Sequence, residues 1–238
     1  MAVRDDLAFA HGATLTVLHV GTEREPVLVV DGATGQIDAL RAFAADHAAF
    51  APANSVGSGY PGLLGTAPVA YVDAMVRGIL PLIATYFTGC PVRPARARGN
   101  FSLVTTAPAD LTADQRVPHV DTADRLQFAT VHFLSPGHRD GTAFFRHRAT
   151  GFETLDAARL PEYQAARAHD PAPPPRYCIG EDDGFEPIEI VPAAPDRLIL
   201  YRAALLHSGW ITTLPAQAAD PRHGRLTGNL FLQCRMAS

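Results

Sequence analysis

The chain has 238 residues and a mass of 25.4 kDa, and its hydrophobic fraction of 47% is typical of a folded globular protein. Its 20 basic residues are all arginines, which excludes lysine Schiff bases and lysine-dependent phosphate loops. The net charge of −4 argues against a nucleic-acid partner, because nucleic-acid binding needs a clustered basic surface.

Cysteine usage and the N-terminus predict where the protein works. Cys90, Cys178 and Cys234 lie far apart with no CxxC pair, a pattern that favours a reducing compartment. Charged residues 4–6 interrupt the position of a signal peptide, and no window approaches the roughly 18 uninterrupted apolar residues of a membrane span. We therefore expect a cytoplasmic protein with no membrane partner; its oligomeric state is left open, with a homodimer as one alternative.

The first part of the chain predicts two strands followed by two helices, over 13–20, 26–30, 36–50 and 71–87. The apolar stripe of the second helix, which starts at Tyr71, indicates a core helix, and Pro81 should kink or break it. The stretch between the helices, residues 54–65, reads as a glycine-rich loop that contains Tyr60, to which we assign no role. The basic run from Arg93 to Arg98 reads as a solvated connector.

From residue 99 the pattern changes to short strands separated by proline- and glycine-rich turns, within 100–106, 126–134, 142–148, 185–191, 197–201 and 225–234. Residues 157–175 predict a surface loop over a short helix. The predicted fold is mainly β with an α layer: a double-stranded β-helix, or jelly roll, with N-terminal helices packed on one sheet. We expect one domain, residues 1–238, in which 1–98 form strands and supporting helices and 99–238 form the jelly-roll core.

Three residues form a candidate metal site. His119 and Asp121 are two residues apart, so in an extended segment both side chains leave the same face. The apolar strand from Leu198 to Tyr201 leads into a connection that ends at His207, which supplies a third ligand. Two imidazoles and one carboxylate are the ligands of non-haem Fe(II) oxygenases, and zinc could occupy the same set.

The last predicted strand has one polar and one apolar face. Read with period two, Arg225, Thr227, Asn229, Phe231 and Gln233 share a face, and leucines and a glycine occupy the other. A polar face that begins with arginine suggests a barrel wall whose inner side holds an anionic ligand, because a guanidinium forks onto a carboxylate.

These segments together resemble the Fe(II)/2-oxoglutarate-dependent dioxygenases, specifically their prolyl 4-hydroxylase-like branch. The resemblance is carried by "HVD" at 119–121, "ATVHFLSPGHRDGTAFF" at 129–145, "DRLILYRAALLHSG" at 196–209 and "RLTGNLFL" at 225–232. The segments "YPG" at 60–62, "FFRHRATGFE" and "LLHSG…GRLTGN" are similar to an uncharacterised bacterial group of such oxygenases.

The resemblance implies that His119, Asp121 and His207 bind iron and that Arg225, helped by Thr227, binds the distal carboxylate of 2-oxoglutarate. It implies hydroxylation of an unactivated C–H bond in an amino acid, peptide or small natural product, using O2 and releasing succinate and CO2. The retained Asp121 favours hydroxylation, since family members that halogenate lack this carboxylate.

Two positions depart from the family. Its usual tyrosine is Phe133 here, and 18 residues separate His207 from Arg225, which makes Arg222 a second candidate for the carboxylate. Two other functions remain open: a non-enzymatic sensor or binding module on the same jelly roll, and a cupin-like metal enzyme that does not use 2-oxoglutarate.

Overall fold

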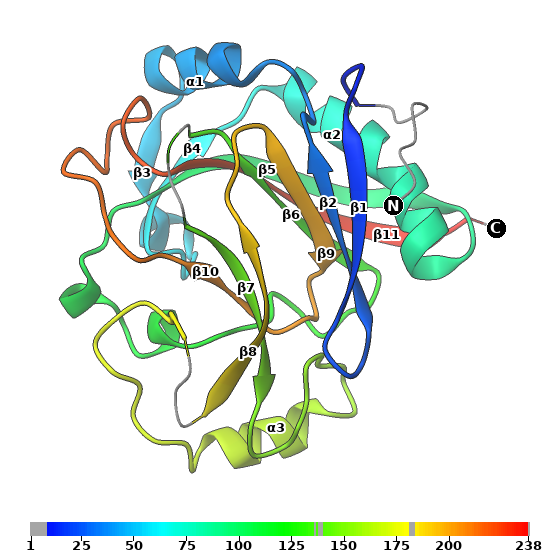
Figure 1. Cartoon of the computed structure of the whole chain (residues 1–238), viewed down its shortest axis with the longest axis vertical. Coiled ribbons are helices and arrows are strands. Elements are labelled where there is room, and N and C mark those ends of the chain that lie inside the picture. The colour runs from blue at the N-terminus through cyan, green and yellow to red at the C-terminus, as the bar shows by residue number, and fades with distance from the viewer. Residues whose placement is uncertain (1–8, 136, 138–139, 181–183, 238) are drawn as a thin grey trace.

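The fold is mainly β, with two antiparallel sheets and three α-helices (Figure 1). The computed structural model describes residues 9–135, 137, 140–180 and 184–237. The major sheet has eight strands in the order β1-β2-β9-β6-β11-β5-β4-β3, and the minor sheet has three in the order β10-β7-β8. The major-sheet strands are β1 (Thr14–Val20), β2 (Glu25–Asp31), β3 (Phe50–Pro52), β4 (Gly62–Thr66), β5 (Val92–Val104), β6 (Gln127–Phe133), β9 (Arg197–Arg202) and β11 (Leu226–Met236). The minor-sheet strands are β7 (Gly141–His147), β8 (Phe185–Pro192) and β10 (His207–Trp210).

The helices agree with the predicted positions, with shifted ends. Helix α1 (Ile37–Asp46) ends earlier than predicted because Phe50 already begins β3. Helix α2 (Val69–Ile83) contains Pro81, and a π-helical turn (Ala84–Thr88) follows it, so the helix loses its regular geometry just after the proline. Helix α3 (Leu160–Arg167) is the short helix expected within 157–175.

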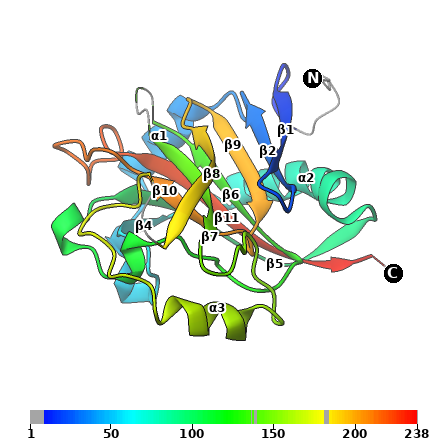
Figure 2. The same ribbon diagram turned by 60° about the horizontal axis from the view of Figure 1, so that its bottom comes forward.

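Helix α2 covers one face of the major sheet, and the minor sheet faces the other side (Figures 1 and 2). Two glycines allow the close approach. A Cβ at Gly99 would lie 2.5 Å from a methyl of Val72, and a Cβ at Gly228 would lie 2.3 Å from the hydroxyl of Tyr71. Tyr71 and the rest of its stripe are buried, which confirms the predicted core helix.

The α2 segment is also apolar enough to be compared with a membrane span. Residues Val69–Thr88 form one continuous helical stretch with a mean hydropathy of 1.3. The stretch carries Asp73 and Arg77, and its buried residues belong to the core shared with β5 and β11. Of the apolar window in this stretch, 33% is buried inside the molecule, on the face that packs on the sheet.

The structure corrects two sequence interpretations. Residues Arg93 to Arg98 are not a connector, because they lie in the first half of β5 and pair with β11 from Arg235 to Phe231. The predicted glycine-rich loop contains β4, which pairs with the second half of β5, from Asn100 to Val104. Strands β1 to β4 thus belong to the same sheet as β6, β9 and β11.

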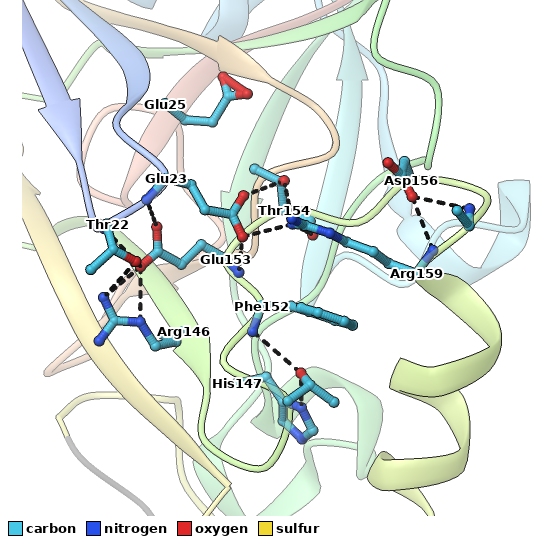
Figure 3. A network of polar contacts seen from close by, with 12 residues as sticks. Thr22, Glu23, Glu25, Arg146, His147, Phe152, Glu153, Thr154, Asp156 and Arg159 are labelled. Carbon is cyan, nitrogen blue, oxygen red and sulfur yellow. Dashed lines mark hydrogen bonds and ion pairs between the residues drawn. The ribbon is translucent and has the colours of Figure 1, made fainter.

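Buried Glu153 joins the β1–β2 turn to the segment after β7 (Figure 3). Its carboxylate accepts hydrogen bonds from the backbone N–H of Thr22 at 3.0 Å and of Glu23 at 2.9 Å. It also accepts hydrogen bonds from the guanidinium of Arg146, and the carboxylate of Glu23 accepts one from Arg159 at 2.6 Å. Because every charged group in this network has a partner, the hairpin is fixed against the minor sheet.

Candidate metal centre

The three predicted metal ligands meet where β10 begins. His207 is the first residue of β10, and His119 and Asp121 lie in the extended segment before β6. The backbones of His119 and His207 exchange two N–H···O=C hydrogen bonds, each 2.9 Å, and the N–H of Asp121 donates to the carbonyl of Ala203 at 2.9 Å. The main chain therefore sets the position of all three side chains.

Their ligand atoms lie within 4.8 Å of one another. The Nε2 atom of His119 is 3.8 Å from one carboxylate oxygen of Asp121, and the Nε2 atom of His207 is 3.6 Å from the other. Each distance is too long for a direct hydrogen bond and leaves a space between the three donors. The arrangement is a candidate His-Asp-His metal triad, placed as the H-x-D spacing and the distal histidine predict.

The histidines present the chemical form that a metal requires. The Nδ1 atom of His207 lies 2.8 Å from the carbonyl of Leu205, so Nδ1–H donates and Nε2 keeps its lone pair. Burial lowers the pKa of His207 to about 4. Although 54% of the His119 side chain is accessible, it lines the cavity, and desolvation together with neighbouring His207 lowers its pKa to about 4. Both imidazoles are therefore neutral at pH 7.

The pKa of Asp121 shifts in the opposite direction. Desolvation raises the pKa of its carboxyl to about 6, against the opposing effect of His119. Two imidazole nitrogens and one carboxylate within 4.8 Å of one another are a donor set that fits a divalent metal ion.

Arg225 and Thr227 line the same cavity, whose volume is about 470 Å³. Arg225 is 6% exposed and donates from Nη2 to the carbonyl of Gly141 at 2.9 Å, but its Nε has no hydrogen-bond partner among the described residues. The carboxylate of Asp140 is 4.0 Å from that Nε and already accepts both the N–H and the hydroxyl of Thr212. The guanidinium is thus buried with an unused donor, which suits an anionic ligand.

Two aromatic residues flank this arginine. Phe133 stands where the resembling dioxygenases usually have a tyrosine, and its ring centre lies 5.6 Å from the Arg225 guanidinium carbon. Tyr60, which the sequence left unassigned, lines the cavity near Arg225, Ser102 and Thr227, and within the described part of the chain its buried hydroxyl has no hydrogen-bond partner. Burial raises the pKa of Tyr60, so its hydroxyl is a donor. The sequence signal was only a tyrosine in a glycine-rich segment, and pairing of β4 with β5 is what brings it to the cavity.

Arg222 lies elsewhere. It forms an ion pair with Asp46 at the end of α1, and about half of its side chain is exposed. The insert 212–224 that contains it loops out, as the long spacing requires, and Arg41 donates to the Arg222 carbonyl. Of the two candidate arginines, only Arg225 reaches the cavity. Part of the 129–145 motif, residues 136 and 138–139, lies outside the described residues.

Comparisons with known proteins give a family and several similar structures. The chain belongs to a protein family described as a family of unknown function, DUF6445, whose profile matches residues 11–232. No curated protein matches the chain.

Among solved structures, the chain is similar to SnoN, described as a non-heme alpha-ketoglutarate-dependent epimerase from nogalamycin biosynthesis, with 16% identity, a TM-score of 0.47, and coverage of 87% of this chain and 77% of that one. It is also similar to an N-substituted L-amino acid dioxygenase from Burkholderia ambifaria AMMD, with 12% identity, a TM-score of 0.41 and coverage of 95% and 98%. Iron-bound HygX from Streptomyces hygroscopicus gives 12% identity, a TM-score of 0.42 and coverage of 87% and 81%.

Proposed function

We propose that the protein is an Fe(II)/2-oxoglutarate-dependent oxygenase that hydroxylates an unactivated C–H bond. The proposal depends on one combination: a triad of His119, Asp121 and His207 and an incompletely paired buried guanidinium, Arg225, that line a single cavity. Iron bound by the triad would supply the oxidation of the C–H bond, coupled to conversion of 2-oxoglutarate and O2 into succinate and CO2.

The residues of this chain divide the remaining tasks. The main-chain bonds of His119, Asp121 and His207 hold three side chains at the wall of the cavity, where they would bind the iron. Arg225 and Thr227 bind the distal carboxylate of 2-oxoglutarate, and the Tyr60 hydroxyl donates to the same group. Phe133, which cannot donate, packs against the guanidinium instead.

Two alternatives predict different behaviour. A non-enzymatic sensor would bind the metal and the carboxylate without turnover. A cupin-like enzyme would bind the metal but have no use for Arg225, whose buried and unused Nε favours a carboxylate cosubstrate. Cytoplasmic location, iron as the working metal and a small-molecule or peptide substrate remain parts of this proposal.

Anaerobic titration of Fe(II) and then 2-oxoglutarate tests the binding site. A keto acid chelating Fe(II) produces a visible charge-transfer absorption. We expect this absorption in the wild type, its loss in Asp121→Ala, and its retention in His19→Ala, a control in which an exposed histidine of the sheet-edge strand β1 is removed. Arg225→Gln should require far more 2-oxoglutarate, and Arg222→Gln should not. Absence of the absorption in the wild type would contradict the proposal.

A further inference from the structure

A second cavity of about 380 Å³ adjoins the metal triad. It shares Ser58, Tyr60, Asp121, Asn229 and Phe231 with the cavity that contains Arg225, so the two spaces adjoin one another. Its own walls add polar and charged side chains: Arg96, Arg98, Asn100, Gln127 and Gln233. Two arginines therefore lie in the wall of a space that adjoins the triad.

Strand register places both arginines on the cavity face of the major sheet. Arg98 pairs with Phe231 of β11, Phe231 pairs with Ala129 of β6, and Ala129 pairs with Tyr201 of β9. The ring of Tyr201 lies 4.8 Å from that of His207. Arg98 thus shares one row of the sheet with the residue beside the triad, about three strand spacings or about 14 Å away between backbones.

Arg96 lies two residues from Arg98 on the same face and pairs with Gln233. Within the described part of the chain, neither arginine has an ion pair or a side-chain hydrogen bond. By contrast, Arg146, Arg197 and Arg202 each face a carboxylate. Asp121, the carboxylate in this cavity wall, belongs to the triad, and Asp124 accepts a hydrogen bond from the Gln233 amide at 3.0 Å. Two adjacent guanidiniums at a cavity wall are thus left with their charge unneutralised.

These arginines and Arg225 serve opposite ends of the cavity. Arg225 directly precedes β11, whereas Phe231, the partner of Arg98, lies six residues along that strand, about 20 Å away in an extended chain. One small dicarboxylate cannot contact both ends while its keto-acid group lies at the triad. Arg96 and Arg98 therefore need an anion other than the carboxylate that Arg225 binds.

We propose that the substrate carries an anionic group, a carboxylate or a phosphate, that Arg96 and Arg98 bind while the carbon to be oxidised lies at the triad. This inference rests on the proposed function. Two guanidiniums two residues apart on one strand face can fork onto the oxygens of a single such group. The cavity volume is that of a small-molecule site, so the anion belongs to a small molecule or to one side chain of a peptide.

The experiment measures binding to protein loaded with Zn(II) and saturated with 2-oxoglutarate, so that Arg225 is occupied and no turnover occurs. Calorimetry compares three panels in parallel, all capped as N-acetyl methylamides so that the side chain carries the only charge: acidic amino acids, O-phosphorylated hydroxy amino acids, and the side-chain amides of the acidic set. We expect anionic probes to bind and their neutral amides not to, and the two anionic arms distinguish carboxylate from phosphate.

The variants assign the binding to the two arginines. Arg96→Ala and Arg98→Ala should each lower the affinity for the anionic probe about tenfold, and the double variant should lower it about a hundredfold. Arg77→Ala, which removes an exposed arginine from α2 on the opposite side of the sheet, should leave the affinity unchanged. Binding should also weaken as ionic strength rises, because both guanidiniums are exposed.

Three results would overturn the inference: preferential binding of neutral amides, anion affinity that is unchanged in the double variant, or no anionic probe bound by the wild type. Failure of the underlying function looks different, because Zn(II)-loaded protein would then not bind 2-oxoglutarate in the first titration. The double variant should retain 2-oxoglutarate binding, which also shows that it is folded.

Discussion

The guanidinium of Arg225 lies over the ring of Phe133, with 5.6 Å between the guanidinium carbon and the ring centre. A phenylalanine here holds the arginine through its π face without consuming any N–H donor. The phenol of Tyr60 lies near the same guanidinium but comes from the segment before β4. The tyrosine expected in β6 from the resemblance to 2-oxoglutarate-dependent dioxygenases is thus absent. Tyr60, from another element, is available to the carboxylate that Arg225 would bind.

We predict that Tyr60→Phe weakens 2-oxoglutarate binding about tenfold, since one hydrogen bond to a charged group is lost. Calorimetry on Zn(II)-loaded protein measures this affinity. Tyr86→Phe, in a residue that packs against the core on the α2 side, serves as the control and should bind normally. An unchanged affinity in Tyr60→Phe would show that this hydroxyl does not touch the cosubstrate.

Glu153→Ala should destabilise the protein by about 3 kcal/mol, because the buried carboxylate accepts two backbone N–H groups and Arg146 (Figure 3). Urea unfolding measures the free energy. Glu186→Gln removes a more exposed carboxylate that pairs with the same arginine, and it should lower the free energy of unfolding by less than about 1 kcal/mol. Equal effects of the two changes would mean that Glu153 does not anchor the hairpin.

Asp196 predicts a loss of stability in acid. Burial alone would raise the pKa of its carboxyl, but hydrogen bonds from His132, Thr34 and Gly35 outweigh burial and lower it from 3.8 to about 2. Because the pKa of Asp196 is lower in the folded state than in the unfolded chain, the ionised carboxylate stabilises the fold by about 2 kcal/mol above about pH 4. This stabilisation is lost as the pH falls towards about 2.

Asp196→Asn tests this linkage. Asp196 has a φ of +58°, a conformation that asparagine also tolerates, so the backbone should survive the change. Unfolding free energies measured across the acid range should be lower than wild type at pH 6 and converge with it near pH 2. A constant difference at every pH would contradict the assignment of the acid dependence to this carboxyl.

Much of the site could be predicted because period-two patterns are local. The H-x-D pair needed only an extended chain, and the polar face of β11 follows from alternation: Gly228 and Leu230 do face α2 while Thr227 and Asn229 line the cavity. His132, also in the 129–145 motif, does not take part in the candidate metal triad; it is buried and its Nδ1 lies 3.0 Å from the hydroxyl of Tyr71.

The first half of β5 could not be predicted in this way. Pro94 and the alanines that follow it disfavour a strand locally, and pairing with β11 holds this segment extended. Pro94 is tolerated because β4 ends opposite Asn100, which leaves this part of β5 at a sheet edge, and because the register shifts between Gln233 and Cys234. Arg96 and Arg98 become cavity residues only through this long-range pairing.

β10 was missed for a related reason. It has four residues, and it pairs with β7, about sixty residues earlier in the chain. His207 was correctly singled out as a residue that follows an apolar strand, but its position beside His119 depends on the two backbone hydrogen bonds between them. Contacts between distant segments leave no periodic pattern in the sequence, so they cannot be predicted from it in this way.

The central claim is tested most directly by oxygen-dependent succinate formation from 2-oxoglutarate in protein reconstituted with Fe(II). We predict that the wild type forms succinate slowly even without its substrate, with succinate and CO2 in equal amounts. Asp121→Ala should lower the rate by orders of magnitude, and His19→Ala should not. Absence of succinate from wild-type protein that holds Fe(II) and 2-oxoglutarate, across the anionic probes as well, would contradict the account and favour the sensor.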